Sequence, residues 1–260
     1  MILSSPDKLS YRPRRIVSLV PSQTELLHYL GLEEETIAIT KFCVHPATWF
    51  NNKTRIGGTK VIHIEKIKAL DPDLIIANKE ENVKEQVEML AADFPVWVTD
   101  VNNLTDAYSM ISDIGILTGK EKEARALVSA IKIKFDLLFQ LSDINKIISA
   151  CYIIWKDPLM TVGADTFISN MLNVAGFKNA FGDMQRYPEI SISQLKNSGC
   201  KIVLLSSEPY PFKQKHIDEL QKELPGIKVI MVDGEMFSWY GSRLLLSADY
   251  LKDQFGDLEI

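Results

Sequence analysis

The sequence predicts an α/β protein built from two Rossmann-like lobes with parallel sheets, joined by one long helix between the lobes. Three observations predict this fold class. Short β-branched runs alternate with amphipathic stretches, the alternation stops once and restarts, and a long amphipathic stretch separates the two sets. We expect the N-terminal lobe over 13–118, the linking helix over 119–142 and the C-terminal lobe over 143–260.

The first set of elements starts close to the N-terminus. Its strands are short runs rich in Val, Ile and Leu, which are typical of parallel strands buried on both faces. Gly31 and Gly119 follow two of its helices, as glycines in the left-handed conformation do. We expect strands over 15–20, 36–40, 73–78 and 96–100, and helices over 22–31, 63–70, 82–92 and 104–119.

The second set repeats this alternation in the last part of the chain. Its strand-like runs include IISACYIIW and KIVLLSS, and Gly176 follows one of its helical stretches. We expect strands over 147–155, 201–207 and 228–234, and helices over 164–176, 212–224 and 242–255.

The stretch between the two sets has the pattern of one long helix. A helix from Lys120 to Leu141 would be about 33 Å long at roughly 1.5 Å per residue, which is enough to bridge two lobes. A single crossover helix within one large sheet is the alternative that this pattern leaves open. The apolar positions recur at spacings of three and four residues, on one helix face: Ala124, Leu127, Val128, Ile131, Phe135 and Leu138.

Composition and charge exclude several classes of protein. The chain of 260 residues carries 29 Lys and Arg against 34 Asp and Glu, and its net charge of −5 argues against a nucleic-acid partner. Its 3 cysteines form no C-x-x-C pair, so we expect no disulfide framework. No apolar run approaches the roughly 18 residues of a membrane span, and we expect a monomer without one.

The N-terminal stretch MILSSPDKLSYRPRR lacks the apolar segment of an export signal. On this pattern alone the protein would work in the cytoplasm, unless its native start is a different one.

The common enzyme signatures are absent from the sequence. The turn after the first strand reads V-P-S-Q-T-E instead of G-x-G-x-x-G, and no P-loop, G-x-S-x-G or H-E-x-x-H motif occurs. We therefore expect a binding protein with no catalytic residue and no resident metal or cofactor. The alternative is a cytoplasmic metal or tetrapyrrole enzyme of the chelatase type, which needs His45 or His63 to face one cleft with Glu80 or Glu235.

The segment KFCVHP follows a predicted strand and carries two groups that can bind metals. If the segment is extended, Cys43 and His45 point to the same side, where a thiolate and an imidazole could ligate a transition metal or a haem iron. The structural alternative is that Cys43 packs as a small apolar side chain and His45 caps the turn at Pro46.

Aromatic residues gather in the loops that follow strands. Ligands of α/β sheets bind outside the carboxyl ends of the strands, where aromatic rings would offer an apolar wall to a large flat ligand. The residues in these positions are Phe42, Trp49, Trp155, Tyr187, Tyr210, Phe212, Phe237, Trp239 and Tyr240.

Several stretches, taken in order, resemble the helical-backbone periplasmic binding proteins of ABC importers for vitamin B12, haem and ferric siderophores. They include RIVSLVPSQTELLHYLG, the loop KFCVHP, ALDPDLIIA, PLMTVGADTFISNMLNVAGFKNAF and FSWYGSRLLLSADYL. The resemblance covers about 15–250 and is greatest to the vitamin B12-binding branch. In that branch tryptophans stand where this chain has Asn78 and Met236.

The resemblance implies two α/β lobes on one long helix, with the ligand in the cleft between them and a periplasmic location. The implied ligand is cobalamin or another metal chelate, and the implied partner is an ABC permease. The aromatic rings that would stack on the ligand are those of Phe42, Trp155, Tyr187, Phe237 and Trp239. Cys43 and His45 would make polar or metal contacts, and Arg186 and Arg243 would contact ligand carboxylates or phosphate. Glu81 and Glu208 would dock onto the permease.

Overall fold

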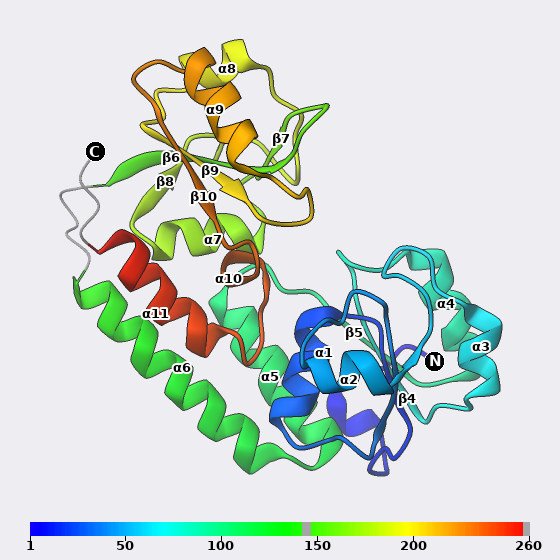
Figure 1. Ribbon diagram of the computed structural model, residues 1–260. Helices are drawn as coiled ribbons and strands as arrows, with labels where there is room; N and C mark the ends of the chain where they lie inside the picture. Colours follow the sequence, from blue (N-terminus) through cyan, green and yellow to red (C-terminus); the bar gives the residue numbers. More distant parts are fainter. Residues whose placement is uncertain (142–146, 257–260) are drawn as a thin grey trace. The chain divides into compact units, whose positions relative to one another are not determined.

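The computed structural model describes residues 1–141 and 147–256, and these form two compact units (Figure 1). Unit 1 comprises Met1–Val101, Thr105–Ala130 and Trp239–Arg243. Of the described residues, unit 2 comprises 102–104, 131–141, 147–238 and 244–256.

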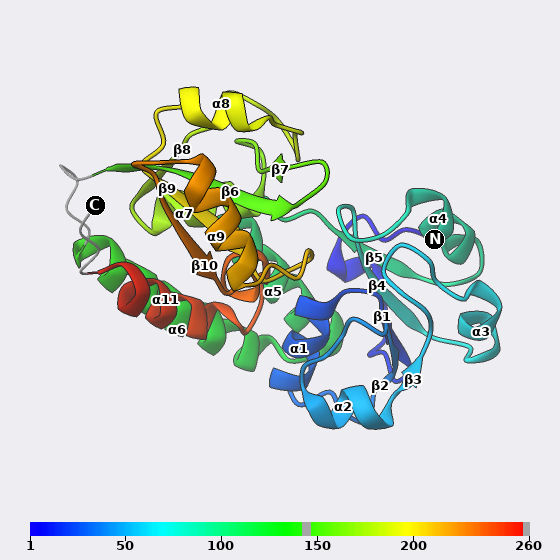
Figure 2. The same ribbon diagram turned by 45° about the horizontal axis from the view of Figure 1, so that its top comes forward.

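Unit 1 is built on a five-stranded parallel sheet in the order β3-β2-β1-β4-β5. Helices α3 and α4 lie together on one face of this sheet and α1 lies on the other (Figure 2). The strands are β1 (Ile16–Ser18), β2 (Thr36–Ile39), β3 (Thr54–Arg55), β4 (Leu74–Asn78) and β5 (Val96–Thr99), and the helices are α1 (Pro21–Tyr29), α2 (Ala47–Asn52), α3 (Ile64–Ala69), α4 (Lys84–Asp93) and α5 (Leu104–Thr118).

Unit 2 has its own five-stranded sheet in the order β10-β9-β6-β7, with β8 also paired to β6. All pairs are parallel except β6 with β7. The strands are β6 (Ile148–Trp155), β7 (Met160–Thr161), β8 (Phe177–Asn179), β9 (Ile202–Ser206) and β10 (Lys228–Val232), and the helices are α7 (Phe167–Val174), α8 (Ile192–Asn197), α9 (Gln214–Glu223), α10 (Glu235–Ser238) and α11 (Leu244–Phe255).

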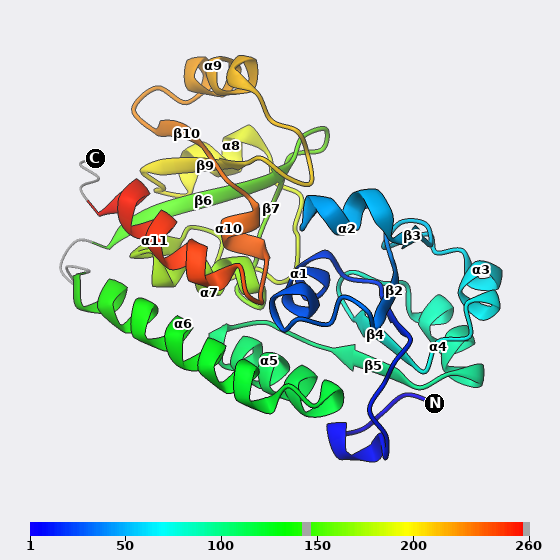
Figure 3. The ribbon, with the colours of Figure 1, turned by 60° about the horizontal axis from the view of Figure 1, so that its bottom comes forward.

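Helix α6 (Glu121–Leu141) confirms the predicted long helix to within one residue. Its first part, up to Ala130, belongs to unit 1, and the remainder belongs to unit 2. In unit 2, α11 runs along α6 (Figure 3), and Lys134 of α6 forms an ion pair with Asp249 of α11. The predicted apolar face is buried at Ala124, Leu127, Ile131, Phe135 and Leu138.

The strands form two separate sheets, so the alternative of one large sheet with a single crossover helix is wrong. Gly31, Gly119 and Gly176 all have positive φ, as predicted for residues that follow helices. The elements missing from the prediction are the 3-10 helix η1 (Pro6–Lys8) and α2, β3, β7, β8, α8 and α10, each six residues or fewer. In the part of the chain that the structure describes, no helix has both the length and the apolar character of a membrane span.

Candidate functional site

The carboxyl edge of the unit 1 sheet carries a cluster of uncharged polar side chains. The strand order reverses between β1 and β4, and open α/β sheets bind ligands outside the strand ends at such a point. Ser18 Oγ lies 2.8 Å from Thr24 Oγ1, and Gln23 Nε2 donates to Thr99 Oγ1 at 2.5 Å. Asn78 Nδ2 donates to the same Thr99 hydroxyl at 3.1 Å. These hydrogen bonds join the end of β4 to that of β5, and they tie the ends of β1 and β5 to α1.

Phe42 stands in the loop after β2 with its side chain at the surface. The residue is 51% exposed, and Lys41 Nζ lies 5.1 Å from the centre of its ring. The ring packs over Gly58, where a Cβ atom would come within 3.0 Å of it. A large exposed aromatic ring held in this way offers apolar area for a ligand.

Cys43, the next residue, is buried completely. Its sulfur lies 3.1 Å from Thr24 Oγ1 and 3.2 Å from Thr40 Oγ1. Burial raises the pKa of the Cys43 thiol, so the group stays protonated near neutral pH. The thiol thus packs as a small, buried side chain that is hydrogen-bonded to two threonine hydroxyls.

His45 lies in the same loop and is half-buried. Its ring meets Trp239 edge to face, with 5.5 Å between the ring centres. Trp239 in turn lies under the Arg243 guanidinium, whose Cζ is 4.9 Å from the ring centre. Arg243 forms a bidentate ion pair with Glu25 of α1, with distances of 2.6 and 3.0 Å. Glu25 has no place among the predicted site residues, and the only sequence signal for it is its position in P-S-Q-T-E.

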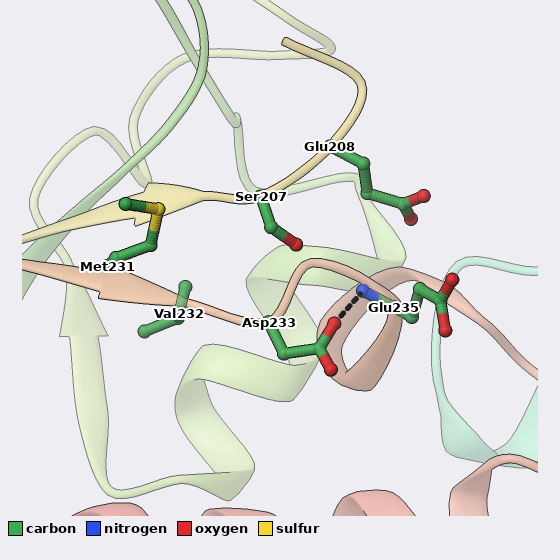
Figure 4. Close-up of a pocket in the computed structure, with 6 residues that line it drawn as sticks. All are labelled: Ser207, Glu208, Met231, Val232, Asp233 and Glu235. Carbon is green, nitrogen blue, oxygen red and sulfur yellow. Dashed lines mark hydrogen bonds between the residues drawn. The ribbon is translucent and has the colours of Figure 1, made fainter. Parts of the chain in front are cut away.

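Unit 2 contains a hollow of about 590 Å³ at the carboxyl ends of β9 and β10 (Figure 4). Figure 4 shows three carboxylates, those of Glu208, Asp233 and Glu235, beyond the ends of the two strands. Asp233 Oδ1 accepts from the Glu235 backbone N–H at 3.0 Å, and Glu208 Oε1 accepts from Ser238 Oγ at 2.8 Å. The remaining lining residues are Ser207, Met231 and Val232. This hollow therefore favours cationic groups.

The other predicted ligand residues of unit 2 lie at its surface, with one exception. Trp155 is 39% exposed and packs edge to face on Tyr210. Arg186 is exposed, with its guanidinium 5.6 Å from the Tyr187 ring centre and its backbone N–H donating to Asp165. Phe237 is the exception, because it is fully buried and packs against Tyr152 and Phe255.

The structure thus brings Phe42, His45, Trp239 and Arg243 into one unit, although Trp239 and Arg243 come from the end of the chain. Glu81 is half-buried at the start of the loop after β4, where its backbone N–H donates to Asn78. His63 is exposed at the start of α3. Across residues 1–141 and 147–256, no group of three His, Cys, Asp or Glu side chains could hold a metal ion.

Comparison with known proteins identifies the family. Residues 16–228 match the family described as periplasmic binding protein. A vitamin B12-binding protein of Pectobacterium carotovorum is 25% identical over 246 residues, which is 93% of this chain and 88% of the relative. An uncharacterized ABC transporter substrate-binding lipoprotein of Bacillus subtilis, YvrC, is 30% identical over 188 residues, 69% of this chain and 59% of the relative.

Two solved structures share the fold. The periplasmic vitamin B12-binding protein BtuF of Vibrio cholerae superposes with a TM-score of 0.79 at 22% identity, over 93% of this chain and 97% of that one. The periplasmic heme-binding protein RhuT from Roseiflexus gives a TM-score of 0.78 at 19% identity, over 94% of this chain and 98% of that one. The chain belongs to the periplasmic binding protein family, as a substrate-binding protein rather than an enzyme.

Proposed function

We propose that this protein binds a corrinoid, or a related metal chelate such as haem or a ferric siderophore, and delivers it to an ABC permease outside the cytoplasmic membrane. The observation that carries this proposal is the match to the vitamin B12-binding relative, which spans 93% of this chain and 88% of the relative. A match over nearly the full length includes the loops of both units, and in such folds the loops determine the ligand.

The proposed ligand contacts are the predicted residues that the structure leaves accessible. Unit 1 contributes the exposed ring of Phe42 and the half-buried imidazole of His45. Unit 2 contributes Trp155, Tyr187 and the Arg186 guanidinium. Aromatic faces suit a flat macrocycle, and a guanidinium suits a ligand phosphate or carboxylate.

The remaining predicted ligand residues are buried, and we give them a supporting role. Cys43 and Phe237 are 0% exposed, Trp239 is 6% exposed and Arg243 is 7% exposed. In addition, the charge of Arg243 is paired with Glu25. These side chains would therefore hold the contact residues in place instead of touching the ligand.

The permease contacts are proposed to be acidic. Glu208 lies with Asp233 and Glu235 around the unit 2 hollow, and Glu81 lies in the loop after β4 of unit 1. Acidic groups on a binding protein complement basic side chains on a partner and speed their encounter.

Titration calorimetry with cyanocobalamin, haemin and several ferric siderophores tests the proposal, together with quenching of the 4 tryptophans. We expect micromolar or tighter binding of cyanocobalamin. Absence of micromolar binding to every chelate would contradict the proposal.

A pair of ligands tests Arg186 separately. Cyanocobalamin carries a phosphodiester that cobinamide lacks, so Arg186→Gln should weaken binding of cyanocobalamin and leave that of cobinamide unchanged. Exposed Arg125 on α6 provides the matched control, Arg125→Gln. Equal losses for the two ligands would remove the phosphate contact from the proposal.

A further inference from the structure

The segment Trp239–Arg243 belongs to unit 1, although Ser238 before it and Leu244 after it belong to unit 2. The chain thus enters unit 1 for five residues, between α10 and α11. No helix or strand lies within this segment, and side-chain contacts with α1 and with the loop after β2 help to hold it in unit 1.

One of these contacts is the ion pair between Arg243 and Glu25. Arg243 Nη2 donates to Glu25 Oε1 at 2.6 Å, and Nε donates to Oε2 at 3.0 Å. The two side chains are only 8% and 18% exposed, so little water competes for either charge. Gly241 permits the approach of the segment to α1, because a Cβ atom there would lie 3.0 Å from the Ser22 carbonyl oxygen.

The ion pair is the first member of a chain of contacts that ends at His45. The guanidinium that binds Glu25 also covers the Trp239 ring at 4.9 Å. The edge contact of Trp239 with His45, at 5.5 Å, then links this segment to the loop that carries Phe42. Three segments, α1, Trp239–Arg243 and the loop after β2, are joined through these four side chains.

We propose that Glu25 and Arg243 are positioning residues. Their ion pair holds Trp239 in place, and Trp239 in turn orients the His45 imidazole for contact with the ligand. The inference rests on the proposed function, since His45 is a proposed ligand contact. Lysine cannot replace Arg243 in this role, because an ammonium group provides neither the two-pronged bond to Glu25 nor the planar face over Trp239.

The test combines ligand affinity with the emission of Trp239. Cyanocobalamin affinity is measured for the wild type, Arg243→Lys and Glu25→Gln, each also in a His45→Ala background. The emission of Trp239 is obtained by subtracting the fluorescence spectrum of each protein's Trp239→Phe counterpart from the spectrum of that protein. We expect Arg243→Lys and Glu25→Gln each to weaken binding by about tenfold and to shift Trp239 emission to the red. In the His45→Ala background each substitution should weaken cyanocobalamin binding by less than about twofold, because the effects of substitutions at residues that act as a unit are not additive.

A merely structural role predicts a different pattern. It would give the same loss with and without His45, and that result would overturn the proposal, as would unchanged affinity and emission in Arg243→Lys. Arg125→Lys, on the exposed face of α6, is the matched control and should change neither readout. Should the wild type bind no chelate, the proposed function fails, while the emission shift still decides whether the ion pair fixes Trp239.

Discussion

The two units place different chemistry at the carboxyl ends of similar parallel strands. In unit 1 the strand ends carry Ser18, Asn78 and Thr99, which take part in a hydrogen-bonded cluster of uncharged side chains. In unit 2 the corresponding edge carries Glu208 and Asp233, whose carboxylates line a hollow. The fold thus supplies the position of a site, whereas the side chains at and just beyond the strand ends decide its chemistry.

A second difference separates two phenylalanines that the sequence predicts to have the same role. Phe42 lies at the surface of unit 1 and Phe237 in the interior of unit 2. Substitutions at these two positions should therefore act on different properties, stability for Phe237 and ligand affinity for Phe42.

The largest effect is expected from Phe237→Ala. Removal of a fully buried ring between Tyr152 and Phe255 leaves a cavity, and we expect a loss of about 3–5 kcal/mol in the free energy of unfolding. Urea denaturation followed by circular dichroism measures this loss. A loss below about 1 kcal/mol would show that Phe237 is not part of the unit 2 core.

The reverse pattern is expected for Phe42→Ala. We expect the free energy of unfolding to stay within about 0.5 kcal/mol of the wild type, because the ring is 51% exposed. Cyanocobalamin affinity should fall roughly 10- to 100-fold, since aromatic contacts carry much of a binding energy. Tyr29→Ala removes an equally exposed ring from α1 and is the control for calorimetry. Equal affinities of the two variants would exclude Phe42 as a ligand contact.

A smaller effect is expected when the acidic hollow of unit 2 loses one charge. Glu208→Gln should weaken binding to the ABC permease by about fivefold at low salt, and the difference should shrink as ionic strength rises. Surface plasmon resonance on the detergent-solubilised permease measures the loss of affinity and its dependence on ionic strength. The affinity for the chelate should not change. Glu88→Gln is the control, because Glu88 is an exposed residue of α4. A salt-independent difference would point to lost packing instead of charge.

The smallest effect concerns His216 of α9. The structure buries this residue against Tyr210 and Phe212, and its Nδ1 accepts from the Lys213 backbone N–H. Desolvation, followed by the charges of Lys156 and Lys215, lowers the pKa of His216 below its ordinary value of 6.5.

The sign of the pH dependence follows from this direction. The unfolded chain binds the proton more tightly than the folded protein, so His216 contributes stability above about pH 6.5 that is lost as the pH falls through its lowered pKa. Urea midpoints at pH 7.5 and pH 5 should therefore differ more for the wild type than for His216→Gln. Identical pH dependences would assign the acid sensitivity to other groups.

The elements of the fold could be predicted to a large extent from the sequence, and the site only in part. Buried runs such as 73–78 and the apolar face of α6 are local patterns, and the structure has β4 over Leu74–Asn78 and α6 over Glu121–Leu141. The predicted helix over 242–255 begins at Leu244 instead, and Arg243, directly before it, is bound to Glu25 in unit 1. Local periodicity contains no information about such a partner.

By itself, the sequence determined the class of fold, the long helix and the family, because each of these is written in spacings between nearby residues or in ordered motifs. Only the tertiary structure decided which of the candidate side chains reach solvent. Cys43 and Phe237 are enclosed by their own units, and Arg243 pairs with a carboxylate 218 positions away. The physical reason is that burial and charge pairing depend on which distant segments fold against one another, and the identity of a residue does not specify its neighbours in space.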